Sequence, residues 1–222
     1  MTLPSPTRRN PIWFSLQMLL RVIFAVWFRY QPKGHERIPP EGGALVVSNH
    51  ESHLDPLIVG MPFRRPISFV VRENLWRVPL FGWLIKYNYS IPISRTATSA
   101  ASIRNACEYL EHGFLMGVFP EGTRSPDGVV KKFRPGFVTL AKRSRVPVYP
   151  CGIAGANQAM PRGAWFIRPR KIAIVYGEPF SVEDIAALAE RGEEKQLAQM
   201  AEERVIACQA EAEAIIRGGQ VM

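Results

Sequence analysis

The sequence predicts a layered α/β domain, because short apolar runs alternate along the chain with segments of helical periodicity. Runs of this kind are typical of buried strands, and they occupy residues 44–48, 67–71, 115–119, 146–153 and 172–176. A chain of 222 residues with 47% hydrophobic residues can bury one core. We find no repeat or low-complexity linker, so we predict one domain at residues 33–222, preceded by a separate segment at residues 1–32.

The N-terminal segment contains an apolar and aromatic stretch at residues 12–30. Its length approaches that of a transmembrane helix, but Arg21 lies near its centre, where a charge costs about 2.5–3.5 kcal/mol to insert. No small-residue cleavage site follows, which argues against a signal peptide. Trp27 and Tyr30 are typical interfacial residues, so we expect a membrane-associated helix that lies in the interface or enters it from one side. A helix buried in the core is the alternative.

Helical patterns lie between and after the predicted strands. Residues 99–112 place apolar side chains on one face and are followed by Gly113, a typical helix stop. Ser181 and Asp184 have the spacing of a capping box, with Asp in the place of the usual Glu. Residues 197–215 then follow helical spacing. These patterns predict helices that pack against the sheet.

The charge and the cysteines narrow the function classes. A formal net charge of +9 favours anionic partners, namely nucleic acid, acidic lipid headgroups or phosphorylated cofactors. The basic residues are dispersed and no nucleic-acid recognition motif is evident, so we expect no nucleic-acid partner. The three cysteines are widely spaced and form no CxxC pair. We therefore expect each of them to behave as a small, buried apolar residue: Cys107, Cys151 and Cys208.

The first candidate site is the segment from Asn49 to Pro56. Residues five apart do not share a helical face, so His50 and Asp55 can cooperate only if a turn separates them. Asp55-Pro56 has the form of a helix start, with Asp as N-cap and Pro as first helical residue. A strand-to-helix turn would leave His50 at the carboxyl end of a strand, where open α/β sheets bind ligands. An imidazole oriented by a carboxylate can take a proton from an attacking hydroxyl at neutral pH.

Other interpretations of this segment stay open from the residues alone. Asp55 could simply cap a helix, with His50 as a hydrogen-bonded turn residue. His50, His53 and Asp55 could ligate a metal by residue type, although no further cluster completes such a site. Ser52 could be a nucleophile, but the Gly-x-Ser-x-Gly elbow is missing.

The second candidate site is the loop at residues 120–125, which follows the predicted strand 115–119. Glycine beside hydroxyl and guanidinium groups can surround an anion, because backbone N–H groups approach closely and Arg binds oxygens in pairs. Arg95 ends another short apolar run and could supply a second guanidinium. A solvent loop stabilised by a Glu121–Arg124 pair is the alternative interpretation.

These residues, taken in order, resemble the 1-acylglycerol-3-phosphate acyltransferase family (lysophosphatidic acid acyltransferases, PlsC-like). The first family motif, Asn-His-x-Ser-x-x-Asp, is matched at residues 49–55, and the second ends at Arg95. The third, Phe-Pro-Glu-Gly-Thr-Arg-Ser, is complete at residues 119–125, and the fourth, Val-Pro-Val-x-Pro, lies at residues 146–150. One departure is Arg134, which stands where Lys usually follows the third motif, so the charge is kept but the geometry differs.

The resemblance implies a glycerolipid-acyltransferase-like fold with a mixed, largely parallel sheet flanked by helices. It implies that His50, oriented by Asp55, activates the free hydroxyl of a lysophospholipid, first of all 1-acyl-sn-glycerol-3-phosphate, which then attacks the thioester of acyl-CoA or acyl-ACP. Arg95, Glu121, Gly122 and Arg124 would surround the acceptor's phosphate. The full set of implied substrate-binding residues is Asn49, Ser52, Arg95, Glu121, Gly122, Thr123 and Arg124.

The resemblance also implies the setting of the reaction. We expect no metal and no cofactor beyond acyl-CoA or acyl-ACP as co-substrate. The expected location is the cytoplasmic face of a bacterial inner membrane rich in anionic lipids, as a peripheral or monotopic protein, with residues 75–87 as a second membrane contact. The alternatives are another acceptor, such as a lyso-ornithine lipid or a glycolipid, and a non-catalytic membrane-binding protein on this fold.

Overall fold

The apolar runs form the centre of a sheet in the computed structural model, which describes residues 5–6, 11–72, 90–93, 100–190 and 192–218. The strands are β1 (Gln31–Lys33), β2 (Ala44–Ser48), β3 (Ile67–Arg72), β4 (Ile91–Ile93), β5 (Leu115–Val118), β6 (Val148–Ala154) and β7 (Ala173–Tyr176). They form a seven-stranded sheet in the order β1-β7-β6-β2-β5-β3-β4. Only β6 and β7 pair antiparallel among the strand pairs described, so the sheet is mixed and largely parallel, as predicted.

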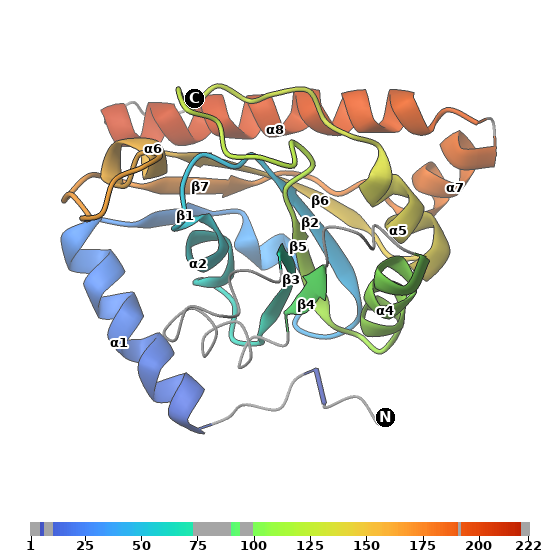
Figure 1. Cartoon of the computed structure of the whole chain (residues 1–222), viewed down its shortest axis with the longest axis horizontal. Helices are drawn as coiled ribbons and strands as arrows, with labels where there is room; N and C mark the ends of the chain where they lie inside the picture. The colour runs from blue at the N-terminus through green and yellow to red at the C-terminus, as the bar shows by residue number, and fades with distance from the viewer. Residues whose placement is uncertain (1–4, 7–10, 73–89, 94–99, 191, 219–222) are drawn as a thin grey trace.

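Helices cover both faces of the sheet (Figure 1). They are α1 (Pro11–Trp27), α2 (Asp55–Gly60), α4 (Ala100–Glu111), α5 (Gly136–Ser144), α6 (Ala156–Ala159), α7 (Val182–Glu190) and α8 (Glu194–Arg217), with a 3-10 turn, η1 (His35–Arg37). Along β2, Val46 packs toward α1 and α2, whereas Leu45 and Val47 pack toward α4, α5, α7 and α8. This alternation follows from the two-residue period of a strand and buries β2 on both faces.

Most of the predicted elements are confirmed, with shifts of one to three residues at their ends. The capping box forms: the Ser181 amide donates to Asp184 Oδ2 and the Asp184 amide donates to Ser181 Oγ, at 3.1 and 3.0 Å. The strands β1 and β4 and the helices α5 and α6 were not predicted. The elements β1, β4 and α6 have only three or four residues each, and α5 begins at Gly136 right after a proline. All three cysteines are free and buried, as expected.

The N-terminal stretch forms helix α1, which packs against the domain through one side. Phe24 and Phe28 are buried in the same core cluster as Ile58 of α2. Arg21 Nε donates to the Met61 carbonyl at 3.1 Å, and its Nη2 donates to the Phe63 carbonyl at 3.1 Å, just after the end of α2. The opposite side exposes large apolar residues: Met18, Leu19, Val22, Ile23, Val26 and Trp27. Among the helices that the structure describes, none has the length and apolar character needed to cross a membrane.

Candidate active site

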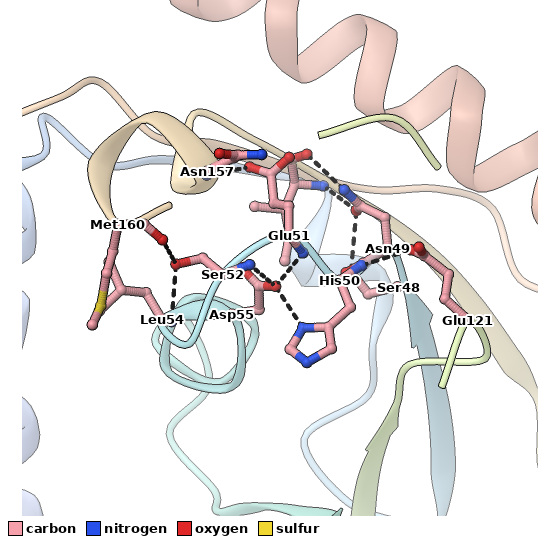
Figure 2. Close-up of polar contacts among 11 residues, drawn as sticks. Ser48, Asn49, His50, Glu51, Ser52, Leu54, Asp55, Glu121, Asn157 and Met160 are labelled. Atoms are coloured by element: carbon pink, nitrogen blue, oxygen red, sulfur yellow. Dashed lines mark hydrogen bonds and ion pairs between the residues drawn. The ribbon is translucent and has the colours of Figure 1, made fainter. Parts of the chain in front are cut away.

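The turn between β2 and α2 brings His50 and Asp55 together (Figure 2). His50 Nδ1 lies 2.7 Å from Asp55 Oδ2. The same oxygen accepts hydrogen bonds from the amides of Glu51 and Ser52, at 2.7 and 2.8 Å. Asp55 is fully buried, and these three contacts stabilise its Oδ2, whereas its Oδ1 has no hydrogen-bond partner among the described residues. The turn and the imidazole are therefore held by one oxygen atom.

The predicted role of Asp55 as helix N-cap is wrong in detail. The cap position is Leu54, which makes no side-chain cap hydrogen bond, and Asp55 is already the first helical residue, with Pro56 following. The carboxylate points back to the turn that precedes the helix instead of onward to the helix amides. Asp55 thus fixes the backbone on which His50 stands as well as the ring of His50.

An aromatic stack holds the imidazole from the side. The His50 ring stacks on Phe119 with centroids 4.2 Å apart and planes at 17°, and Phe119 stacks on Phe69 at 5.7 Å and 5°. Gly117 on β5 makes room for this stack, because a Cβ there would lie 2.2 Å from the Phe69 ring. With Nδ1 engaged by Asp55, the second ring nitrogen is the one left to exchange a proton, and it points away from Asp55 in Figure 2.

The loop that carries the third motif forms hydrogen bonds with the backbone of His50. The His50 amide donates to Glu121 Oε1 at 2.8 Å, and the His50 carbonyl accepts from the Ser125 amide at 2.7 Å. The other Glu121 oxygen accepts from the Lys131 amide at 3.3 Å. Burial raises the pKa of Glu121, while the two amide donors oppose that effect. Glu121 therefore joins the two predicted sites into one through a side chain that is itself buried.

Two more predicted substrate-binding residues make their hydrogen bonds inside the protein. The Asn49 side chain is paired with the backbone of Ile153 on β6, donating to its carbonyl at 3.0 Å and accepting from its amide at 2.8 Å. Ser52 Oγ donates to the Met160 carbonyl at 2.9 Å and accepts from the Leu54 amide at 3.3 Å. Both side chains are buried. Their geometry suits a role in holding the turn.

The remaining predicted residues lie on the open side of this loop. Gly122, at φ +72°, and Thr123 are exposed, and a Cβ on Gly122 would lie 3.3 Å from the Arg134 guanidinium. Arg124 is half-buried, and within the part of the chain that the structure describes its Nη1 has no hydrogen-bond partner. Burial, followed by the charge of Arg162, lowers the pKa of Arg124. Arg95 and residues 75–87 lie outside the described residues.

Burial and neighbouring charges shift the pKa values of two further residues in the first motif, His53 and Glu51. Burial, with the charges of Arg124 and His50, lowers the pKa of His53. Burial, and then the charge of Asp55, raises the pKa of Glu51 to about 8. Glu51 Oε1 accepts from the Asn157 amide at 3.0 Å. The charge of Arg162 acts on Arg124, and the Arg134 guanidinium lies close to Gly122, so positive charge gathers around the loop 120–125, where it would favour an anion.

Several residues of the site could not be found from the sequence. Phe69, Gly117 and Arg162 lie outside the predicted site segments, and Phe119 belonged to the third motif without a predicted role of its own. The adjacency of Glu51 to His50 was visible, but the burial that neutralises its carboxyl depends on α6 and the loop at Gly128 packing against it.

Comparison with known proteins places the chain among acyltransferases of lipids. A family model described as Acyltransferase matches residues 29–154. The crystal structure of the 1-acyl-sn-glycerophosphate (LPA) acyltransferase PlsC from Thermotoga maritima has the same fold, with a TM-score of 0.74 and 28% identity. That match covers 92% of this chain and 79% of the Thermotoga chain.

Curated relatives include proteins of bacteria and plants. The 1-acyl-sn-glycerol-3-phosphate acyltransferase of Pseudomonas aeruginosa is 32% identical over 185 residues, covering 77% of this chain and 71% of that protein. The protein of the same name from Bacillus subtilis is 25% identical and is covered over 88% of its length. The Limnanthes alba protein is 35% identical, and the chain spans about half of it, 51%.

Proposed function

Because the chain belongs to the acyltransferase family, we propose that it transfers a fatty acyl group from a thioester to the free hydroxyl of 1-acyl-sn-glycerol-3-phosphate, giving phosphatidic acid. The observation that carries the mechanism is the 2.7 Å contact between His50 Nδ1 and Asp55 Oδ2, which leaves the second ring nitrogen available. The printed names of the Pseudomonas and Bacillus relatives support the choice of acceptor.

The proposed reaction is one direct transfer with His50 as general base. The second ring nitrogen of His50 takes the proton of the acceptor hydroxyl as its oxygen attacks the thioester carbonyl. Asp55 stabilises the imidazolium that forms. When the tetrahedral intermediate collapses, the carbon–sulfur bond breaks and the imidazolium returns the proton to the leaving thiolate. The reaction requires acyl-CoA or acyl-ACP as co-substrate and no metal or other cofactor.

We propose that the acceptor's phosphate binds at the open side of the loop 120–125. Arg124, whose Nη1 has no partner among the described residues, and the exposed residue Thr123 support this position. Arg95 stays a predicted second ligand. Asn49, Ser52 and Glu121 are assigned to holding the turn, because their side chains are buried and hydrogen-bonded within the protein.

We also propose where in the cell the protein acts and which part of the chain contacts the membrane. Residues 1–32 would associate with the cytoplasmic face of a bacterial inner membrane, as a peripheral or monotopic segment, and the domain at residues 33–222 would carry the catalysis. The exposed apolar side of α1, which bears Val22 and Val26, supports an interfacial position.

The test is an acyl-transfer assay with labelled acyl-CoA or acyl-ACP and a panel of lysolipids, with products identified by mass spectrometry. His50→Ala should lose at least about a hundredfold in kcat, because general-base catalysis contributes that much or more. His112→Ala, an exposed histidine at the end of α4, is the matched control and should keep its activity. More than a tenth of the wild-type rate in His50→Ala would exclude the general-base role. A product such as an acylated ornithine lipid or glycolipid, without phosphatidic acid, would overturn the acceptor.

A further inference from the structure

The segment between α6 and β7, residues 161–171, exposes three consecutive large apolar side chains. Trp165, Phe166 and Ile167 are 90%, 46% and 43% exposed. Exposed apolar clusters of this kind usually mark a contact surface, because their hydration costs free energy in the isolated protein. We call residues 161–171 the aromatic loop. The proposed catalytic site uses none of these three side chains.

The aromatic loop has a defined structure at its two ends and at its tip. The Ala164 amide donates to the Pro161 carbonyl at 3.0 Å, and the Arg168 amide donates to the Ala159 carbonyl at 2.9 Å. At the tip, the rings of Trp165 and Phe166 meet edge to face at 5.6 Å. The Arg168 guanidinium lies 5.1 Å from the centre of the Phe166 ring. The exposed rings are therefore presented on a hydrogen-bonded base.

Positive charge surrounds these rings. The aromatic loop contains no Asp or Glu, and its exposed cations are Arg162, Arg168, Arg170 and Lys171. In the described part of the chain, no ion pair involves any of them. Lys171 Nζ donates to the Ile216 carbonyl at 3.2 Å, so its charge is held against the end of α8. Arginine and tryptophan side by side are typical of a membrane–water interface.

The aromatic loop adjoins the end of α1. The Ile172 amide, just after the loop, donates to the Phe28 carbonyl at 3.0 Å, and the Gln31 amide donates to the Ile172 carbonyl at 3.0 Å. Figure 1 shows the orange loop beside the C-terminal end of α1. That end of α1 exposes Val26 and Trp27. Two apolar surfaces from distant parts of the sequence therefore lie at one edge of the molecule.

We propose that the aromatic loop is an anchor that inserts Trp165 and Phe166 into the headgroup region of an anionic phospholipid bilayer. A bilayer fits better than a protein partner, because the surface combines exposed rings with cations and offers no carboxylate to pair with a basic partner. Ser52 Oγ donates to the carbonyl of Met160, the residue that precedes the loop, at 2.9 Å. The anchor would therefore hold the turn that carries His50 at a fixed height over the bilayer. This last step rests on the proposed function of His50.

The test places a fluorescent reporter on the aromatic loop of the full-length chain. The natural cysteines are all buried, so a single exposed cysteine can be labelled selectively. Trp165→Cys carries an environment-sensitive dye, and Ile206→Cys, at an exposed apolar position on α8, is the matched control. Vesicles of phosphatidylglycerol and phosphatidylcholine are compared with vesicles of phosphatidylcholine alone. We expect a blue shift and a several-fold rise in emission for the dye at 165 on the anionic vesicles, and no change for the dye at 206.

A second variant tests the contribution of the loop arginines to vesicle binding. A measurement of acyl transfer on the same protein then separates the membrane anchor from the proposed enzymatic function. Arg168→Gln with Arg170→Gln should weaken binding to the anionic vesicles by up to about 25-fold, since each basic residue near such a surface contributes about fivefold. A dye at 165 that stays in water while the protein is bound, or a chain that does not bind the vesicles, would overturn the anchor. A chain that inserts the loop but transfers no acyl group would overturn the proposed function and leave the anchor intact.

Discussion

Asp55 shows how one buried carboxylate can organise a site. Its Oδ2 accepts from the amides of Glu51 and Ser52 and from the ring of His50, so the backbone and the base share one fixed point. The neighbouring Glu121 repeats this arrangement, with acceptors for the amides of His50 and Lys131. Each carboxylate therefore joins segments that the sequence separates.

Glu51 gives the fold a pH dependence that can be measured. Burial and the charge of Asp55 raise its pKa to about 8, so between the pKa of an unfolded Glu and about pH 8 only the unfolded chain loses this proton. The free energy of unfolding should fall over that range. Glu51→Gln keeps an acceptor for the Asn157 amide and cannot ionise, so its stability relative to the wild type should rise between pH 5 and pH 9.

We expect that rise to be at least about 1.4 kcal/mol, the value of a tenfold change in proton affinity. Urea denaturation at pH 5 and pH 9 measures it for both proteins. Stability curves that run parallel over this range would contradict the burial of an un-ionised Glu51.

Helix α1 illustrates how a charge within an apolar helix finds a partner in the domain. Arg21 binds the carbonyls of Met61, Pro62 and Phe63, and Gln17 Nε2 also donates to Phe63 at 2.8 Å. These carbonyls follow the C-terminal end of α2, where a cation is favourable. Through them, α1 is tied to the helix that begins at Asp55.

Arg21→Met should therefore destabilise the protein. Methionine keeps helix propensity and apolar length but removes the guanidinium donor from three carbonyls, of which that of Phe63 keeps Gln17, at a cost of about 1.5–3 kcal/mol. Val22→Met, at the adjacent exposed position, is the control and should change stability by less than about 0.5 kcal/mol. Equal midpoints of urea denaturation for the two variants would show that the Arg21 contacts add nothing to the docking of α1.

The charge of the whole molecule should govern how it meets a lipid surface. The formal net charge is +9, and the exposed apolar side of α1 is free of acidic residues. Association with vesicles containing phosphatidylglycerol should weaken by at least about tenfold between roughly 0.05 and 0.5 M salt, because salt screens surface charge. Phosphatidylcholine vesicles are the control, and flotation measures both. Salt-independent binding to the anionic vesicles would mean that apolar insertion alone holds the protein.

The local pattern of the chain was sufficient for most of the architecture. Apolar runs of strand length, helical periodicity and the Ser181–Asp184 capping box depend on residues near one another in sequence, so they were predicted close to their observed bounds. The acyltransferase motifs likewise lie in short segments that keep their order and spacing. The requirement that His50 and Asp55 meet through a turn followed from helix geometry alone.

Only the tertiary structure decided how those segments act on one another. It showed that the Asp55 carboxylate fixes the turn instead of capping α2, that Phe119 and Phe69 support the His50 ring, and that Arg21 binds the end of α2. It also set the aromatic loop beside α1. The physical reason is shared: burial, stacking and hydrogen bonding between residues tens of positions apart depend on where the sheet brings them, which no local pattern encodes.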